Sequence, residues 1–134
     1  MEAAEIKTLL EGYAATRAGI RNRVQHIADL KRAEQESQTP GVSWAAEYTR
    51  QIAAELKADQ AIIAGIDAAV AALSDPLSRE VIRLRYMELP NAQLRGWKEV
   101  SAMLYGADYS MRGGKLAVMR RARKAFAELA QIMK

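Results

Sequence analysis

Apolar side chains recur three and four positions apart along most of this chain, and that spacing is typical of helices with one buried face. One series runs from Ile6 to Leu30, and a second runs from Ala45 to Leu73. Alternation of apolar and polar residues, which is typical of a half-buried strand, never persists for long. The sequence therefore predicts an all-α fold.

The first half, residues 1–74, is predicted to be a long antiparallel helical hairpin. Residues 3–36 contain no proline and are expected to form one long helix, and Pro40-Gly41 marks a turn into a second helix that ends near residue 73. Two helices of similar length joined by a short turn fold back on each other. Such a hairpin leaves an apolar seam, which we expect to pack on the C-terminal half or on a second copy of the chain.

The seam of the hairpin is defined by the helical spacing, with two polar interruptions at Arg17 and Asp59. The side chains expected to face it are Ile6, Leu10, Tyr13, Ile20, Val24, Ile27 and Leu30 in the first helix, and Ala45, Tyr48, Ile52, Leu56, Ile63, Ile66, Val70 and Leu73 in the second.

The second half, residues 75–134, is predicted to contain three helices. Asp75 is a good N-cap and Pro76 suits the first helical position, so a helix is expected over 77–88. A short helix over 97–104, a turn at Gly106 and a last helix from about residue 113 to 132 follow. The side chains expected to point inward are Leu77, Val81, Leu84, Trp97, Val100, Met103, Leu104, Leu116, Met119, Ala122, Phe126 and Leu129.

Charge divides the chain at the same place as the helix pattern. Residues 75–134 hold 12 Lys+Arg against 6 Asp+Glu, a net charge of +6, whereas residues 1–74 hold 8 against 10, a net charge of −2. A basic helical segment joined to a near-neutral one is typical of a nucleic-acid-binding module. The other interpretation is that the basic residues only form solvated helix faces.

The order of elements in the second half matches a helix-turn-helix, in which a short support helix precedes a longer helix that enters the major groove. On that hypothesis Arg112 and Lys115 lie nearest the bases, and Arg120 and Arg121 lie on the DNA backbone. Lys98 and Lys124 would contact phosphates. A plain helical hairpin at the end of a bundle remains the alternative.

The segment LSDPLSREVIRLRYMELPNAQLRGWKEVSAMLYGADYSMRGGKLAVMRRARKAFAEL resembles the fourth region of sigma factors, and more closely the sigma-like phage late transcription regulators. The resemblance covers roughly residues 73–130. It implies a three-helix helix-turn-helix that reads double-stranded promoter DNA, with RNA polymerase as a further partner. The chain departs from that pattern at Gly96, where a serine cap is usual, and in the long segment 106–114.

Several classes of protein are disfavoured by composition. The chain has no Cys and a single His, which excludes thiolate and multi-histidine metal sites within one subunit. No nucleophile–base pair or cofactor loop is recognisable, so we expect no enzyme activity, no cofactor and no metal. The charged N-terminus and the lack of a run of about 20 apolar residues predict a soluble, cytoplasmic protein that is not associated with a membrane. The resemblance to phage regulators implies that this is the cytoplasm of a bacterial host, with the protein associated with the nucleoid.

A second hypothesis belongs to a different class. The chain would be a helical interaction protein of a phage, self-associating through the N-terminal hairpin. Its basic half would then bind an acidic protein or coat RNA.

Overall fold

A computed structural model describes residues 1–37, 46–89, 93–106 and 114–134 of the chain. These residues form six α-helices and one short π-helix, and they contain no strand. The elements are α1 (Ala3–Glu11), α2 (Tyr13–Ser37), α3 (Ala46–Ala71), α4 (Pro76–Ile82), the π-helix η1 (Arg83–Met87), α5 (Trp97–Tyr105) and α7 (Lys115–Ile132). The all-α prediction is therefore confirmed for the described residues. The predicted turn at Pro40-Gly41 lies outside them.

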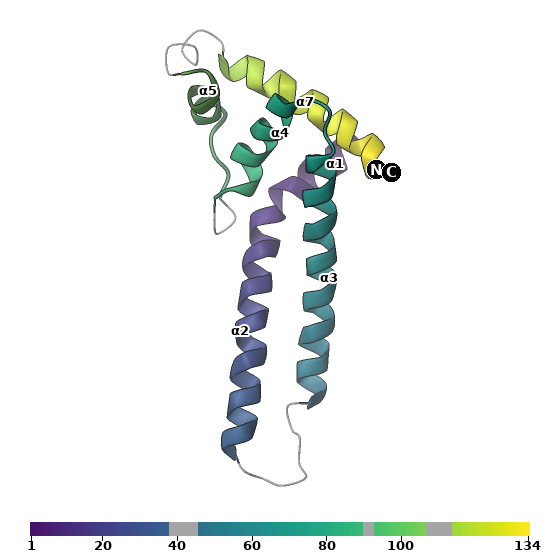
Figure 1. Cartoon of the computed structure of the whole chain (residues 1–134), viewed down its shortest axis with the longest axis vertical. Helices are drawn as coiled ribbons and strands as arrows, with labels where there is room; N and C mark the ends of the chain where they lie inside the picture. The colour runs from purple at the N-terminus through teal and green to yellow at the C-terminus, as the bar shows by residue number, and fades with distance from the viewer. Residues whose placement is uncertain (38–45, 90–92, 107–113) are drawn as a thin grey trace.

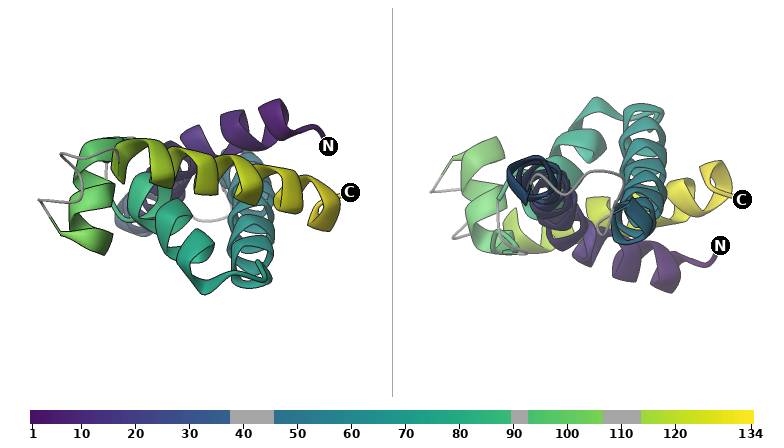
Figure 2. Two further views of the ribbon diagram at one scale, coloured as in Figure 1. Left: turned by 90° about the horizontal axis from the view of Figure 1, so that it is seen from above. Right: turned by 90° about the horizontal axis from the view of Figure 1, so that it is seen from below.

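The molecule consists of a long hairpin and a cluster of shorter helices at one end of it (Figure 1). Helices α2 and α3 lie side by side and form the predicted hairpin. Helices α1, α4, α5 and α7 gather at the end of the hairpin away from the C-terminus of α2 and the N-terminus of α3, where α7 crosses the others and both termini lie close together (Figure 2).

The N-terminal helix is not continuous, which corrects the prediction of a single helix over residues 3–36. It breaks at Gly12, and α1 leaves the hairpin to pack against α7. Ile6 and Leu10 of α1 are buried in the same core as the C-terminal helices. The three-and-four spacing of apolar residues continues across Gly12 in the sequence. It does so because the apolar residues of α1 and those at the start of α2 are buried in the same core, although the two helices approach it from different directions.

The distal part of the hairpin is thinly packed. Ile52 is its one fully buried hydrophobic residue among those described between 46 and 65. Asp59 and Arg23, both polar residues at the seam, form an ion pair across the hairpin, and Arg23 Nε lies 3.4 Å from a Glu55 carboxylate oxygen. Val24 and Tyr48 were expected to face the seam but are half exposed, because two helices alone cover only a narrow stripe of each other.

The start of the second half follows the prediction closely. Asp75 accepts a hydrogen bond from the Leu77 backbone N–H at 3.0 Å and caps α4, with Pro76 at its first position. The helix predicted over 77–88 then widens into η1 from Arg83 onward. The carbonyl oxygens of Leu84 and Arg85 accept hydrogen bonds from Arg95, which ties the segment before α5 to η1.

Helices α5 and α7 occupy the predicted places, and Gly106 ends α5 with a φ of 94°. Two of their side chains correct the predicted core: Met103 is 52% exposed and Leu116 is 57% exposed. The buried face of α7 consists of Val118, Ala122, Ala125, Phe126 and Leu129. It is turned away from Leu116 because α1, α4 and α5 all pack on that side.

One hydrophobic core joins the two halves of the sequence. It includes Ile6 and Leu10 of α1, the end of α3 from Ile66 to Leu73, and buried residues of α4, η1, α5 and α7. Tyr86 is 1% exposed and lies at its centre, with ring centroids 6.1 Å from both Trp97 and Phe126.

Candidate nucleic-acid interface

Helix α5 is held against α7 and η1 by a small aromatic and aliphatic cluster. Val100 is completely buried, and the Trp97 ring packs edge-on against Tyr86. The π-helix supplies Tyr86, and α7 supplies Phe126 on the other side of the same ring. The support helix of the predicted helix-turn-helix is thus anchored through its first residue.

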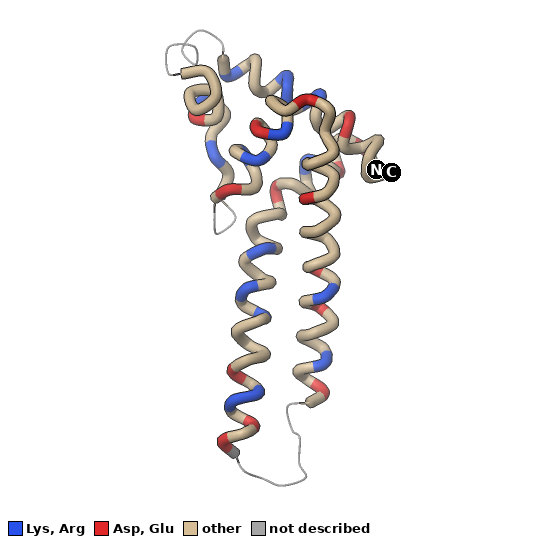
Figure 3. Tube along the Cα trace, in the orientation of Figure 1, with Lys and Arg blue, Asp and Glu red and all other residues tan. Residues whose placement is uncertain are grey.

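The solvent face of α7 is cationic. Three basic side chains on it are exposed and have no ion-pair partner among the described residues: Arg120, Arg123 and Lys124. Lys115 is also exposed and unpaired in the described part of the chain, but it is the first residue of the helix and lies on another side of it. Leu116, near the start of the helix, shares this exposure. Figure 3 shows Lys and Arg of α7 at the end of the molecule away from the C-terminus of α2. A solvated helix face with several uncompensated positive charges attracts a polyanion.

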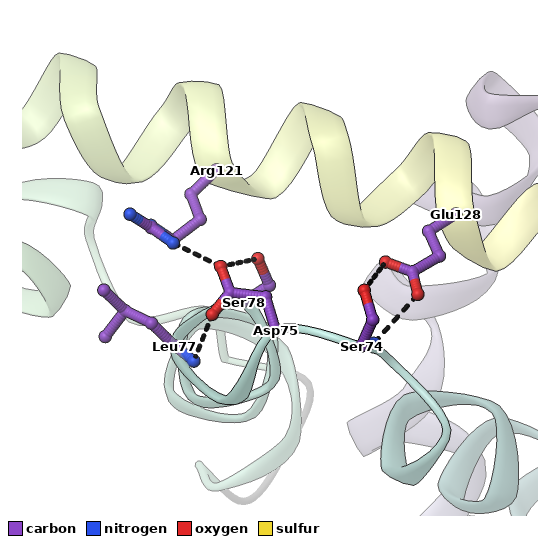
Figure 4. A network of polar contacts seen from close by, with 6 residues as sticks. All are labelled: Ser74, Asp75, Leu77, Ser78, Arg121 and Glu128. Atoms are coloured by element: carbon purple, nitrogen blue, oxygen red, sulfur yellow. Dashed lines mark hydrogen bonds and ion pairs between the residues drawn. The ribbon is translucent and has the colours of Figure 1, made fainter.

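Arg121 differs from its neighbours because it is engaged within the chain. Its guanidinium forms an ion pair with Asp75, and Ser78 Oγ donates a hydrogen bond to the same carboxylate at 3.1 Å (Figure 4). The Leu77 N–H, with Ser78 and Arg121, lowers the pKa of Asp75 below its usual 3.8, against an opposing effect of burial. This contact fixes α7 to the N-terminus of α4.

A second contact holds the C-terminal part of α7 against Ser74, the residue that precedes Asp75. The Glu128 carboxylate accepts hydrogen bonds from the Ser74 backbone N–H at 2.8 Å and from Ser74 Oγ at 3.1 Å (Figure 4). Together with Arg121 and Asp75, these groups set the rotation of α7 about its axis. Arg120, Arg123 and Lys124 of the same helix are exposed to solvent.

The remaining predicted site residues are distributed as follows. Lys98 is exposed on the first turn of α5, on a different helix from the others. Arg112 lies outside the described residues. Arg120 and Lys124 lie one turn apart on a single face of α7, together with Arg123, which is not among the predicted DNA contacts.

Two arginines that the sequence does not single out lie next to this face: Arg85 is partly buried, and the Arg95 side chain is 11% exposed. Arg85 Nη1 donates to the Arg95 carbonyl oxygen at 2.6 Å, and the Arg85 guanidinium carbon lies 4.5 Å from the centroid of the Trp97 ring. Arg95 has carboxylate partners in Glu88 at 3.7 Å and Glu99 at 3.6 Å. Nothing in the sequence signals that the Trp97 ring packs on the Arg85 guanidinium.

Comparison of this chain with protein-family models, with curated proteins and with solved structures finds no match. Within the described residues no helix is both long enough and apolar enough to span a membrane. The residues themselves are then the only basis for a functional proposal.

Proposed function

We propose that this protein is a sequence-specific DNA-binding transcription regulator, of the phage-encoded, sigma-like type that residues 73–130 resemble. The observation that carries the proposal is the solvent face of α7, with Arg120, Arg123 and Lys124 exposed and uncompensated, and with Lys115 exposed at the first residue of the helix. It lies on a helix that follows a short, tryptophan-anchored helix, as the recognition helix of a helix-turn-helix does.

Within this proposal the residues have different tasks. Lys115 and Leu116 lie at the start of α7, the part of a recognition helix that meets base edges, and Leu116 offers an apolar contact for a thymine methyl group. Arg120 and Lys124 contact phosphates. Arg121 keeps its ion pair with Asp75, and its remaining N–H donors reach a phosphate at the edge of the surface. Arg112 and Lys98 complete the proposed set, and RNA polymerase is a proposed further partner.

The test begins with selection of genomic fragments by the purified protein at two salt concentrations. Sequence-specific enrichment that persists at the higher salt supports the proposal, and purely nonspecific retention contradicts it. Affinity for an enriched site is then measured against salt. Arg120→Gln with Lys124→Gln should flatten the dependence of log K on log salt by about 0.9 for each phosphate contact removed. Arg121 is left intact because its replacement also removes a contact that holds α7.

A second candidate function, self-association through the hairpin, is favoured by the thin packing between α2 and α3. Val24 and Ile62 are 50% and 44% exposed, and Ile52 alone is fully buried between 46 and 65 among the described residues. Light scattering after size exclusion measures the mass. A concentration-dependent dimer that Val24→Ser with Ile62→Ser abolishes supports this function, and a monomer at all concentrations contradicts it.

A further inference from the structure

A cleft of about 320 Å³ lies between α1, α5 and α7, on the flank of the cationic face of α7. Its apolar lining comes from all three helices: Ala3 and Ala4 of α1, Trp97 of α5, and Met119, Ala122 and Phe126 of α7. Its charged lining consists of Lys7 from α1, Arg85 from η1, Arg123 from α7 and a single carboxylate, Glu11. The N-terminal helix thus brings a cation to the cleft from the opposite end of the sequence.

The positive charge of this cleft is only partly compensated. Lys7 and Glu11 form a long ion pair at 3.9 Å, and both side chains are well exposed. Exposed pairs of this kind contribute little. Arg123 has no ion-pair partner among the described residues. The lining therefore offers an anion a net charge of about +2, from three cations and one carboxylate.

Arg85 gives the cleft a positive charge that is held in a fixed position. Its guanidinium is held by the hydrogen bond to the Arg95 carbonyl and by the Trp97 ring, and its Nε is buried without a hydrogen-bond partner. Arg95 beside it has two carboxylate partners, whereas Arg85 has none among the described residues. A half-buried cation without a counter-ion is costly, so an anion bound in the cleft would gain from a charge that is already fixed in position.

We propose that this cleft holds one phosphate of the DNA backbone, so that α1 forms part of the DNA-binding surface. This inference rests on the proposed function. Arg123 belongs both to the cleft and to the exposed face of α7, so the two surfaces are continuous. A helix in the major groove is flanked by the phosphates of both strands, and a cation-lined cleft on its flank meets one of them.

The test compares three variants of the full chain, each with a net charge lower by two. The cleft variant is Lys7→Glu, which leaves Arg123 and the other exposed cations of α7 in place. The α7 variant is Arg120→Gln with Lys124→Gln, and the control is Arg32→Gln with Lys57→Gln, which are exposed on the hairpin. For each, affinity for a mixed-sequence duplex is measured over a range of salt, after circular dichroism has shown an unchanged melting temperature. Losing one phosphate contact lowers the salt slope by about 0.9.

The inference predicts that the cleft variant loses about one phosphate contact and that the hairpin control loses none. A cleft variant that binds like wild type while the α7 variant is weakened overturns the inference and leaves the proposed function standing. If neither the cleft variant nor the α7 variant shows a smaller salt slope, both the inference and the proposed function are overturned. An equal loss in the hairpin control shows a general effect of net charge and also overturns the inference.

Trp97 gives a second measurement from inside the cleft. The chain has two tryptophans, so Trp44→Phe leaves Trp97 as the only indole. Duplex DNA should change the fluorescence of this reporter, and the cleft substitution should remove that change. If inorganic phosphate alone produces the change and the DNA salt slope of the cleft variant is normal, the cleft is a site for a free anion and the inference fails.

Discussion

Asp75 is the residue on which the orientation of α7 depends most directly. It caps α4 through the Leu77 N–H and pairs with Arg121 from α7. The pKa of Asp75 is lower in the folded chain than the value of 3.8 in the unfolded chain. Between these two values the unfolded chain therefore binds more protons than the folded chain does. The stabilisation by this carboxylate is therefore complete above its unfolded value, 3.8, and is lost as the pH falls through the lower folded value.

Two substitutions separate the two tasks of Asp75. Asparagine is also a good N-cap, so Asp75→Asn keeps the cap and removes the charge, whereas Asp75→Ala removes both. At pH 7 the melting temperature should fall in the order wild type, Asn, Ala. The gap between wild type and Asn should close as the pH is lowered below 3.8, because wild type then loses the same charge. A gap that stays constant with pH would show that the ion pair with Arg121 contributes nothing.

Two buried tyrosines make opposite use of their hydroxyl groups. Tyr13 Oη donates to an Asp67 carboxylate oxygen at 2.7 Å, whereas Tyr86 Oη is buried and has no hydrogen-bond partner among the described residues. Burial is the main cause that raises the pKa of both phenols. We predict that Tyr13→Phe lowers the free energy of unfolding by about 1 kcal/mol and that Tyr86→Phe leaves it unchanged or raises it. Denaturant titration measures both, and an equal loss in the two variants would contradict the assignment.

At the scale of the elements, the sequence predicts helices better than it predicts their faces. The Asp75-Pro76 start and the glycine after α5 are local signals, and both are confirmed. In α7 the predicted and the observed buried faces share Ala122, Phe126 and Leu129. They differ because Leu116 was predicted to point inward, whereas Val118 is the residue that is buried. Three neighbouring helices decide this, and no pattern within α7 contains that information.

The break at Gly12 shows the same limit and leads to a prediction. Gly12 has a φ of −85°, and a Cβ there would lie 3.7 Å from the nearest atoms, so the break does not require glycine. Gly12→Ala should stabilise the protein by about 0.5 kcal/mol, because alanine restricts the unfolded chain.

Gly106 is the matched control for Gly12, since its φ of 94° is one that other residues rarely adopt. Gly106→Ala should destabilise by about 1–3 kcal/mol, although nothing lies within 4 Å of the added Cβ. Thermal unfolding of both variants makes the comparison. Destabilisation by Gly12→Ala would mean that glycine itself causes the break.

At the scale of the whole molecule, the candidate interface depends on contacts that join the ends of the sequence. The cations of α7 could be predicted from its composition, because surface charge needs no tertiary information. The place of Lys7 beside Arg123 could not, since it follows from α1 turning away from α2 and packing on α7. The sequence also predicts a boundary at residue 74, but the core includes side chains from both sides of it.

The shared core predicts how the chain behaves when it is divided at that boundary. Residues 75–134 alone would expose the face of α7 that α1 covers, together with the surface of α4 and η1 that contacts the hairpin helices. We expect this fragment to show no cooperative thermal transition by circular dichroism, because much of its apolar surface stays in water. Mixing it with residues 1–74 should restore cooperative melting and dispersed amide resonances, since the missing part of the core is then supplied by the other fragment. Cooperative unfolding of the basic fragment by itself would instead show that residues 75–134 form an autonomous domain and that α1 is not needed to hold α7 in place.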